Sequence, residues 1–302
     1  MNEGVETEAE GKGPRSRGPW RRVARRYVRR PAGVVALAVL LTLAGVALEA
    51  GRIASHPVNF VDLAHLNQAA APTLSGRHFF GTDYLGRDLF SQTIYGLRTS
   101  LFIALMVAAA AAVLGVLVGA VAGYARGWPD AILMRGVDLV VTVPVMVVTL
   151  VSYSYFVPLK PRDVGFILIL YMWTAVARVV RASCASLRER EFVEAAHALG
   201  ASPLRIIVRH LLPNALGPAL VATTAVIGQA LVLEATIDFF NLGTTQLAGP
   251  TLGNLVADST KFDVPIQQVP WWTYACPSLV LVLLLLCVNF VGDSLDDALA
   301  AT

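Results

Sequence analysis

Charged residues are scarce in this sequence. Only 15% of its 302 residues are Asp, Glu, Lys or Arg, whereas a soluble globular chain carries about 25%. Hydrophobic residues make up 56% of the chain, and its mean hydropathy is +0.62. This balance argues against a soluble protein and indicates a chain that lies largely within a lipid bilayer.

The chain also lacks the common signatures of catalysis and of bound cofactors. It has no GxxxxGK[ST] loop to hold the phosphates of ATP and no GxSxG turn to present a nucleophilic serine. Its three cysteines, Cys184, Cys276 and Cys287, fit neither a disulfide framework nor a zinc-ligand spacing. We therefore expect no catalytic residue, no metal site and no cofactor on this chain.

One acidic cluster keeps a membrane-embedded enzyme as the alternative class. The segment DSLDD contains Asp293, Asp296 and Asp297, and membrane-bound prenyl transferases bind diphosphate through Mg²⁺ on such aspartates. A site of this kind needs a second acidic cluster on a facing helix. The predicted cytoplasmic loops contain no such cluster, and arginine predominates among their charged residues. The enzyme is therefore the weaker hypothesis.

Six apolar runs approach the length of a membrane span. A spanning helix needs about 20 mostly apolar residues. The runs therefore predict an all-α membrane protein with about six transmembrane helices. They lie at residues 33–51, 101–124, 137–157, 164–180, 215–233 and 271–291.

The basic residues predict how these helices are oriented. With the N-terminus in the cytoplasm, roughly 17 of the 24 Lys and Arg residues lie inside and roughly 7 lie outside, as the positive-inside rule requires. Six spans also return the C-terminal segment, residues 294–302, to the cytoplasm. The predicted location is the cell membrane, with several spans and with both termini cytoplasmic.

The N-terminal segment has two parts. Residues 1–19 are rich in Gly, Glu, Pro and Ser, which predicts a disordered cytoplasmic tail. In residues 20–31, arginine pairs recur every four residues opposite Trp20, Val23 and Tyr27, a pattern typical of an amphipathic helix on the lipid surface. We interpret this segment as membrane-bound and not as a nucleic-acid site, because a spanning helix follows at once, and we expect that helix to be retained.

Three glycines in the second apolar run share one helix face. Gly115, Gly119 and Gly123 are four residues apart, and small residues at this spacing let two membrane helices approach closely. They predict helix packing, either within the chain or against another subunit.

The segment at residues 188–214 predicts two short helices on the cytoplasmic side. Gly200 suits the end of the first helix, Ser202 and Pro203 suit the start of the second, and Pro213 would close it before the next span. The second helix would carry one apolar stripe formed by Leu204, Ile207, Val208 and Leu211. Such a surface favours a docking element, with a purely structural loop as the alternative.

This segment closely resembles the EAA loop of ABC importer permeases. Its extended form is similar to the dipeptide and oligopeptide permease branch. The matching residues are Glu194, Ala195, Ala196, Gly200, Arg209, His210, Leu212, Pro213 and Asn214. The resemblance implies a coupling helix that sits in an ATPase subunit, with Ala201, Ser202 and Arg205 as further contact residues.

A second segment carries the same resemblance. FGTDYLGRDLFSQTIYGLRTSL, residues 80–101, is similar to the extracytoplasmic motif that precedes the permease core in this branch. Its candidate residues are Asp83, Gly86, Arg87 and Asp88. They could form a docking surface for a partner or a locally ion-paired loop, which would contribute little stability.

The resemblance implies a permease subunit of type I ABC importer architecture. It divides the chain into an extracytoplasmic loop at residues 52–99 and a core of five transmembrane helices at residues 100–293. The implied partners are a second permease subunit, two ATP-binding subunits that hold ATP and Mg²⁺, and an extracytoplasmic substrate-binding protein. A di- or oligopeptide is the expected cargo, moved by alternating access. Nickel chelates or other small solutes remain alternatives, because Asp238 and Leu252 depart from the usual residues near the outer mouth.

Three acidic residues fall in or near the apolar runs. A carboxylate within a bilayer is costly, so Glu234, Asp238 and Asp138 are candidates for the translocation path. The alternative is that they pair with arginine or are solvated at helix ends.

Overall fold

The computed structural model describes residues 19–66, 68–73, 78–156, 159–243, 249–260 and 269–300. Across these ranges the chain forms helices and connecting loops without a β-sheet, so the expected all-α fold is confirmed. The predicted disordered tail lies outside the described residues except for Pro19, and so does residue 157 at the end of the third predicted span.

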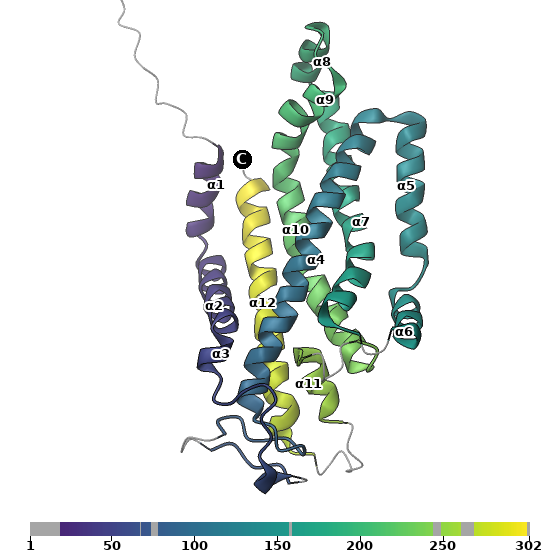
Figure 1. Cartoon of the computed structure of the whole chain (residues 1–302). Coiled ribbons are helices and arrows are strands. Elements are labelled where there is room, and N and C mark those ends of the chain that lie inside the picture. The colour runs from purple at the N-terminus through teal and green to yellow at the C-terminus, as the bar shows by residue number, and fades with distance from the viewer. Residues whose placement is uncertain are drawn as a thin grey trace, which may run out of the picture.

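Four long helices run side by side and form the core of the bundle (Figure 1). They are α4, Leu89–Ala125; α7, Pro161–Arg188; α10, Leu212–Phe239; and α12, Trp271–Ala300. A fifth helix, α2 (Pro31–Leu48), packs against α12 and α4. All five are long and apolar enough to cross a membrane, and many of their large apolar side chains are exposed, which suits surfaces that face lipid or another subunit.

The most extensive contact in the bundle, between α4 and α7, depends on glycine. Gly115, Gly119 and Gly123 of α4 face α7, and a β-carbon on any of them would come within 2.6 Å of an atom of α7. The backbones of the two helices can therefore approach closely only because these residues lack side chains. The glycine face of α4 packs against α7 of the same chain, so the alternative of packing within the chain holds and not the one of packing against another subunit.

The third predicted span, residues 137–157, is wrong as a continuous helix. The structure has α5 (Gly127–Thr142) and α6 (Val145–Tyr155), which are bent by 67° relative to each other. Pro144 explains the break, because it lacks an N–H and disfavours a helical conformation in the preceding residue. Val143 is accordingly extended, with φ −81° and ψ 124°. The described residues thus contain five unbroken candidate spans, or six if the bent pair crosses the membrane as one.

The loop predicted at residues 52–99 is shorter in the structure, because α4 begins within it at Leu89. Asp88 caps the helix, and its carboxylate accepts a hydrogen bond from the Ser91 N–H at 2.9 Å. An N-cap of this kind satisfies a backbone donor that would otherwise lack a partner. The first part of α4 therefore carries the end of the extracytoplasmic motif on a helix.

The C-terminal segment, residues 294–302, is not separate from the sixth span, since α12 continues to Ala300. Asp297 on this last part forms an ion pair with Arg30, which lies between α1 (Pro19–Val28) and α2. The pair gives the extension a partner on the N-terminal segment. As a result α1 and the end of α12 lie at the same end of the bundle (Figure 1).

Replacing Gly119 by alanine is expected to destabilise the chain by about 1–3 kcal/mol, because a β-carbon there would lie 2.5 Å from the Ala177 carbonyl oxygen and push α4 from α7. Gly45→Ala in α2 is the matched control, since a β-carbon at Gly45 meets nothing within 4 Å. Thermal unfolding of the full chain in detergent measures both variants. Equal melting temperatures would contradict the packing role of Gly119.

Candidate functional site

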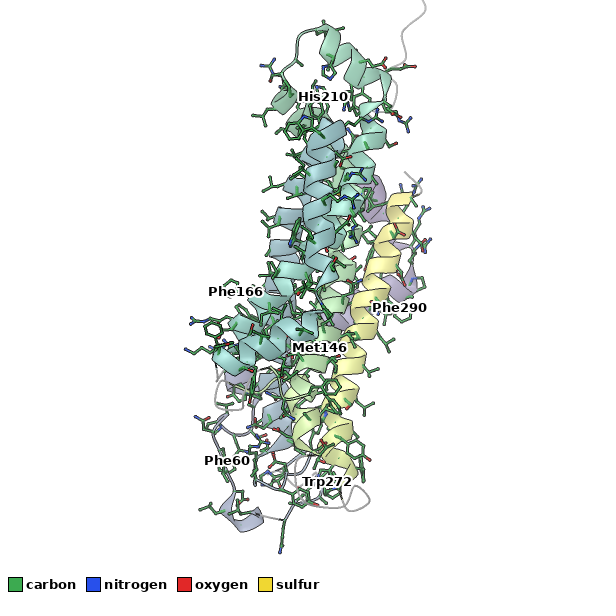
Figure 2. The ribbon with its side chains drawn as sticks, turned by 90° about the vertical axis from the view of Figure 1, so that its right-hand side faces the viewer. Phe60, Met146, Phe166, His210, Trp272 and Phe290 are labelled. Carbon is green, nitrogen blue, oxygen red and sulfur yellow. The ribbon has the colours of Figure 1, made fainter. Side chains whose placement is uncertain are left out.

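The loop between α7 and α10 protrudes at the same end of the bundle as α1 and the end of α12 (Figure 1). It consists of α8 (Glu191–Ala198), α9 (Pro203–Ile206) and a π-helical turn, η2 (Ile207–Leu211), which leads directly into α10. Figure 2 shows His210 of this loop at one end of the molecule and Trp272 at the other. Among the described residues, the loop therefore protrudes toward any partner that binds at this end.

Gly200 forms the joint between the two helices of the loop. Its φ is +77°, a left-handed conformation that glycine adopts without strain. Its N–H donates a hydrogen bond to the His197 carbonyl at 2.9 Å, which ends α8. Ser202 occupies the N-cap position of α9 without a side-chain capping bond, and Pro203 takes the first helical position.

The second helix of the loop does not end at Pro213, so that prediction is wrong. The Leu212 N–H donates to the Ile207 carbonyl five residues back, which makes a wider turn than an α-helix has. Pro213 then falls in the first turn of α10, where a missing N–H is tolerated. The wider turn lets one helical run continue from the loop into the span.

The predicted apolar stripe of this helix is divided between two faces. Leu211 is fully buried and Ile207 is half-buried, whereas Leu204 and Val208 are 71% and 55% exposed. Ile206, which the pattern did not include, is fully buried. The π turn is the physical reason, because it shifts the register of a 3.6-residue period.

The loop also presents most of the residues expected to contact an ATPase. Ala196 is buried and Ala201 is half-buried. The other predicted contact residues are exposed: Glu194, Ala195, Gly200, Ser202, Arg205, Arg209 and Pro213. Four large apolar side chains are exposed beside them, with fractions of 42–88%, namely Phe192, Leu199, Leu204 and Val208. Phe192 and Leu199 lie between two candidate spans, and Leu204 and Val208 lie at the start of the run Pro203–Phe239. A concentration of exposed apolar residues in a protruding loop suits a protein contact.

Contacts from the end of α4 hold the base of the loop. The ring of Tyr124 stacks on His197 with 6.2 Å between centroids, and the Arg188 guanidinium lies 5.4 Å from the same ring. Arg188 also donates to the Tyr124 carbonyl, and Arg126 forms an ion pair with Glu189. Tyr124 and Arg126 belong to no motif in the sequence, and their contacts with residues 188–197 join positions that are far apart in the chain.

At the opposite end, the segment before α4 folds around a buried arginine. Arg87 Nε donates to Asp83 at 2.6 Å, and Arg87 Nη2 donates to Asp258 of α11 (Leu252–Asp258) at 3.1 Å. All three side chains are at most 11% exposed. Burial alone would lower the pKa of the Arg87 guanidinium, but the two carboxylates outweigh burial and raise that pKa overall. The residues of the motif are therefore ion-paired locally, as one of the two alternatives has it, but the pairs are buried and extend to Asp258 of α11.

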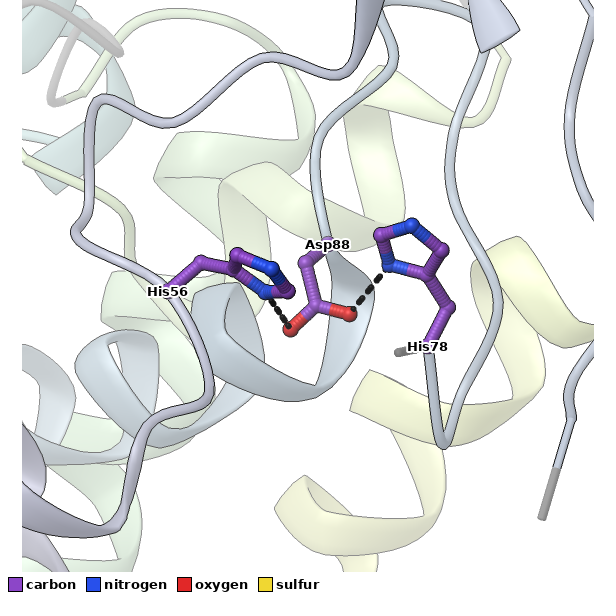
Figure 3. Close-up of side chains that lie close together, drawn as sticks. All are labelled: His56, His78 and Asp88. Atoms are coloured by element: carbon purple, nitrogen blue, oxygen red, sulfur yellow. Dashed lines mark hydrogen bonds and ion pairs between the residues drawn. The ribbon is translucent and has the colours of Figure 1, made fainter. Parts of the chain in front are cut away.

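The remaining motif residues shape the same segment. Gly86 has φ +71° and its carbonyl accepts from the Asp62 N–H at 2.7 Å, so the two stretches of loop lie in direct backbone contact. Asp88 caps α4 and faces His56 and His78 (Figure 3). The two histidines and Asp258 were not predicted: His56 and Asp258 are distant in sequence from the motif, and His78 lies just before it at no recognised ligand spacing.

The three predicted path residues lie in two places. Asp138 on α5 is exposed and accepts a hydrogen bond from Arg178 of α7 at 2.9 Å. Glu234 and Asp238 are one turn apart on α10, and each is 1% exposed. The structure therefore brings the last two together and leaves Asp138 with an arginine partner elsewhere.

Groups from α4 and α11 enclose the acids of α10. Ser100 Oγ donates to Glu234 at 3.1 Å and accepts from the Leu252 N–H, also at 3.1 Å. The hydroxyl of Thr251, which caps α11, donates to Asp238. The acidic pair thus connects three helices within one chain.

A bundle of apolar helices with a helical loop at one end defines a multi-pass membrane protein. Residues 115–302 match the family described as binding-protein-dependent transport system inner membrane component. Residues 18–72 match the N-terminal TM domain of oligopeptide transport permease C. The chain belongs to the family of binding-protein-dependent transport system inner membrane components, as the sequence resemblance implied.

Individual relatives agree with this assignment. The chain is 35% identical over 286 residues to a protein of Brucella suis biovar 1 with the provisional name peptide permease protein, covering 94% of this chain and 92% of that one. It is 34% identical over 285 residues to the oligopeptide transport system permease protein OppC of Mycobacterium tuberculosis, covering 92% of each.

A solved structure is similar in fold. An inward-facing structure of the MetNI methionine ABC transporter matches with a TM-score of 0.53 and 18% identity, over 70% of this chain and 97% of the matched chain. The expected ABC importer permease architecture is confirmed.

Arg87→Ala is expected to cost about 3–5 kcal/mol of folding stability, because it leaves the carboxylates of Asp83 and Asp258 buried without their cation. Arg52→Ala is the matched control at the same end of the bundle. Arg52 pairs with Glu49 at the surface, with the two side chains 83% and 50% exposed, so its loss is expected to cost less than about 1 kcal/mol. Thermal unfolding in detergent compares the two, and a similar small effect of both would refute a structural role for the buried pair.

Proposed function

We propose that this chain is one transmembrane subunit of an ATP-driven importer of di- or oligopeptides. The relatives named as peptide and oligopeptide permeases each cover more than nine-tenths of the chain, and this coverage supports the cargo class. Import of nickel chelates or other small solutes by the same scaffold is the alternative.

ATP and Mg²⁺ are bound by two partner subunits, and the loop between α7 and α10 is their contact. The exposed apolar side chains of the loop are the observation that carries this proposal, because Leu199 lies between two candidate spans and is 88% exposed, and Leu204, the second residue of the run Pro203–Phe239, is 71% exposed. Glu194 and Arg205 add exposed charges of both signs. Burial of such a surface in an ATPase subunit would remove apolar area from water.

Movement of the loop is transmitted to the outer end by one helical run. From Pro203 to Phe239 the run has 37 residues, about 55 Å at the rise of an α-helix. Its far end carries Glu234, which accepts a hydrogen bond from Ser100 of α4, and Asp238, which accepts one from Thr251 at the cap of α11. Displacement of the loop by the ATPases would therefore move α10 against α11, which is the kind of rigid-element shift that alternating access requires.

The translocation path lies between this chain and a second permease subunit. Separation of α11 from α10 would uncover Glu234 and Asp238 on that path, whereas Asp138 would reach it only if its pair with Arg178 opened. A substrate-binding protein delivers the cargo at the outer end, where the folded segment around Arg87 and α11 offers a preformed surface.

Leu204→Glu tests the contact with the ATPase subunits. The substitution is expected to abolish their co-purification with the permease and ATP-dependent uptake of labelled peptides into proteoliposomes, because a carboxylate would enter an apolar interface. Leu63→Glu is the matched control, since Leu63 is 79% exposed and lies before α4 at the other end of the bundle. ATPase co-purification is expected to survive in the control.

The two parts of the proposal fail in different ways. Wild-type association and uptake in Leu204→Glu would exclude the loop contact. Normal ATPase association together with uptake of a nickel chelate but not of peptides would replace the cargo class and leave the permease role intact.

The predicted orientation is tested with single cysteines at Leu63 and Leu204, placed in a chain whose native Cys184, Cys276 and Cys287 are replaced by alanine. A membrane-impermeant maleimide is expected to label Leu63→Cys on intact cells and Leu204→Cys only after permeabilisation, because the positive-inside rule puts the loop in the cytoplasm. The reverse labelling pattern would invert the topology.

A further inference from the structure

Two histidines and an aspartate meet at the outer end of the bundle. The ligand atoms of His56, His78 and Asp88 all lie within 4.8 Å of one another. His78 Nδ1 is 3.0 Å from Asp88 Oδ1, and His56 Nδ1 is 3.7 Å from Asp88 Oδ2. Figure 3 shows the two rings on either side of the carboxylate.

We propose that these three residues bind a divalent transition-metal ion with the preferences of Zn²⁺. Two imidazoles and one carboxylate are ligands that Zn²⁺ accepts, with a fourth position for water. Ligand atoms on one tetrahedral Zn²⁺ lie about 3.3 Å apart, and the two distances to Asp88 fall on either side of this value. Small rotations of the rings are therefore enough to surround an ion.

The environment of His56 is an independent indication. Its Nδ1 is buried and has no hydrogen-bond partner in the described part of the chain, and a buried nitrogen in this state costs about 1–3 kcal/mol. The same atom is among those that converge in the cluster. A metal ion at this point would satisfy it, which the carboxylate at 3.7 Å does not.

The surroundings of His78 resemble an outer shell of a metal site. Its second ring nitrogen, Nε2, lies 3.4 Å from a carboxylate oxygen of Asp62. Histidine ligands commonly donate their other N–H to a carboxylate, which fixes the ring and strengthens metal binding. His78 Nδ1 is then the nitrogen left to face the cluster.

The backbone and ring of His56 are also held in place. Its N–H donates to Ser91 Oγ at 3.0 Å, and that hydroxyl donates to Asp88 Oδ2 at 2.6 Å. The ring of His56 stacks on Phe60 with 4.1 Å between centroids. A bound ion would therefore connect three points of the outer segment: the stretch after α3 (Ala50–Ile53), the loop at His78 and the cap of α4.

We assign the ion a structural role, because it would connect parts of one segment, between α3 and the start of α4, which lies at the end of the bundle away from the loop between α7 and α10 (Figure 1). His78 is 6% and Asp88 is 1% exposed, whereas the side chain of His56 is 21% exposed and leaves access for an ion. The sequence led us to expect no metal site. The proposal departs from that expectation, because His56, His78 and Asp88 follow no known ligand spacing and are brought together only by the fold.

The test uses the full chain purified in detergent without a polyhistidine tag, stripped with a chelator and titrated with Zn²⁺ by calorimetry. One Zn²⁺ per chain is expected for the wild type, with loss of binding in the double variant H56Q/H78Q. D62N is expected to weaken binding about 10–100-fold through its effect on His78. The matched control H197Q/H210Q removes two histidines of the other end and is expected to bind normally.

Absence of Zn²⁺ binding in the wild type would overturn the proposal, and so would equal binding by H56Q/H78Q. If the double variant does not fold, H56Q alone decides, because the Nδ1 it removes makes no hydrogen bond. Zn²⁺ is expected to raise the melting temperature of the wild type and of H197Q/H210Q but not that of H56Q. A rise of the same size in H56Q would assign the effect to another site.

Discussion

The close approach of α4 and α7 is the interaction on which the rest of the structure depends. Within lipid, helices gain little from the hydrophobic effect against one another, so they associate where small residues let their backbones meet. Gly115, Gly119 and Gly123 provide that surface along α4. The same contact places Tyr124 beside Arg188 at the base of the protruding loop, so packing within the spans fixes the position of a site outside them.

The two ends of the bundle are stabilised by different interactions. The protruding loop has exposed apolar side chains and few ionic contacts to the rest of the chain, so it can serve as a contact surface. The opposite end encloses the buried ion pairs of Arg87 with Asp83 and Asp258. Buried pairs of this kind tolerate little displacement, because separation leaves a charge without compensation. These pairs fix the segment before α4 to α11.

Local sequence patterns predicted much of the fold. Long apolar runs marked the five unbroken spans, and a glycine spacing of four marked the packing face of α4. The break at Pro144 was missed because the apolar run continues on both sides of it. The π turn before Pro213 was missed because it alters the helical register without any change in composition.

Much of the candidate site could not be predicted, because it depends on contacts between distant residues. Arg87 and Asp258 are separated by 171 positions, and Ser100 and Glu234 by 134. The motif at residues 80–101 contains Arg87 and Ser100, but it does not indicate that Asp258 and Glu234 are their partners. The family resemblance identified the contact residues of the loop, most of which are exposed. The stacking of Tyr124 on His197 at the base of the loop is evident only in the structure.

The segment between α3 and α4 depends on polar contacts for its stability. Between α3 and α4 the described residues form mostly irregular structure, with a 3₁₀ turn at Leu63–His65 and an isolated β-bridge between Thr82 and Asp88. Such a segment buries little apolar surface to offset the conformational entropy lost on folding. Specific polar contacts must therefore contribute more here than in the spans. Asp88 is central to them, because one carboxylate caps α4 and also faces both histidines. A metal ion at that carboxylate would add bonds at the point where the irregular segment joins the helical bundle.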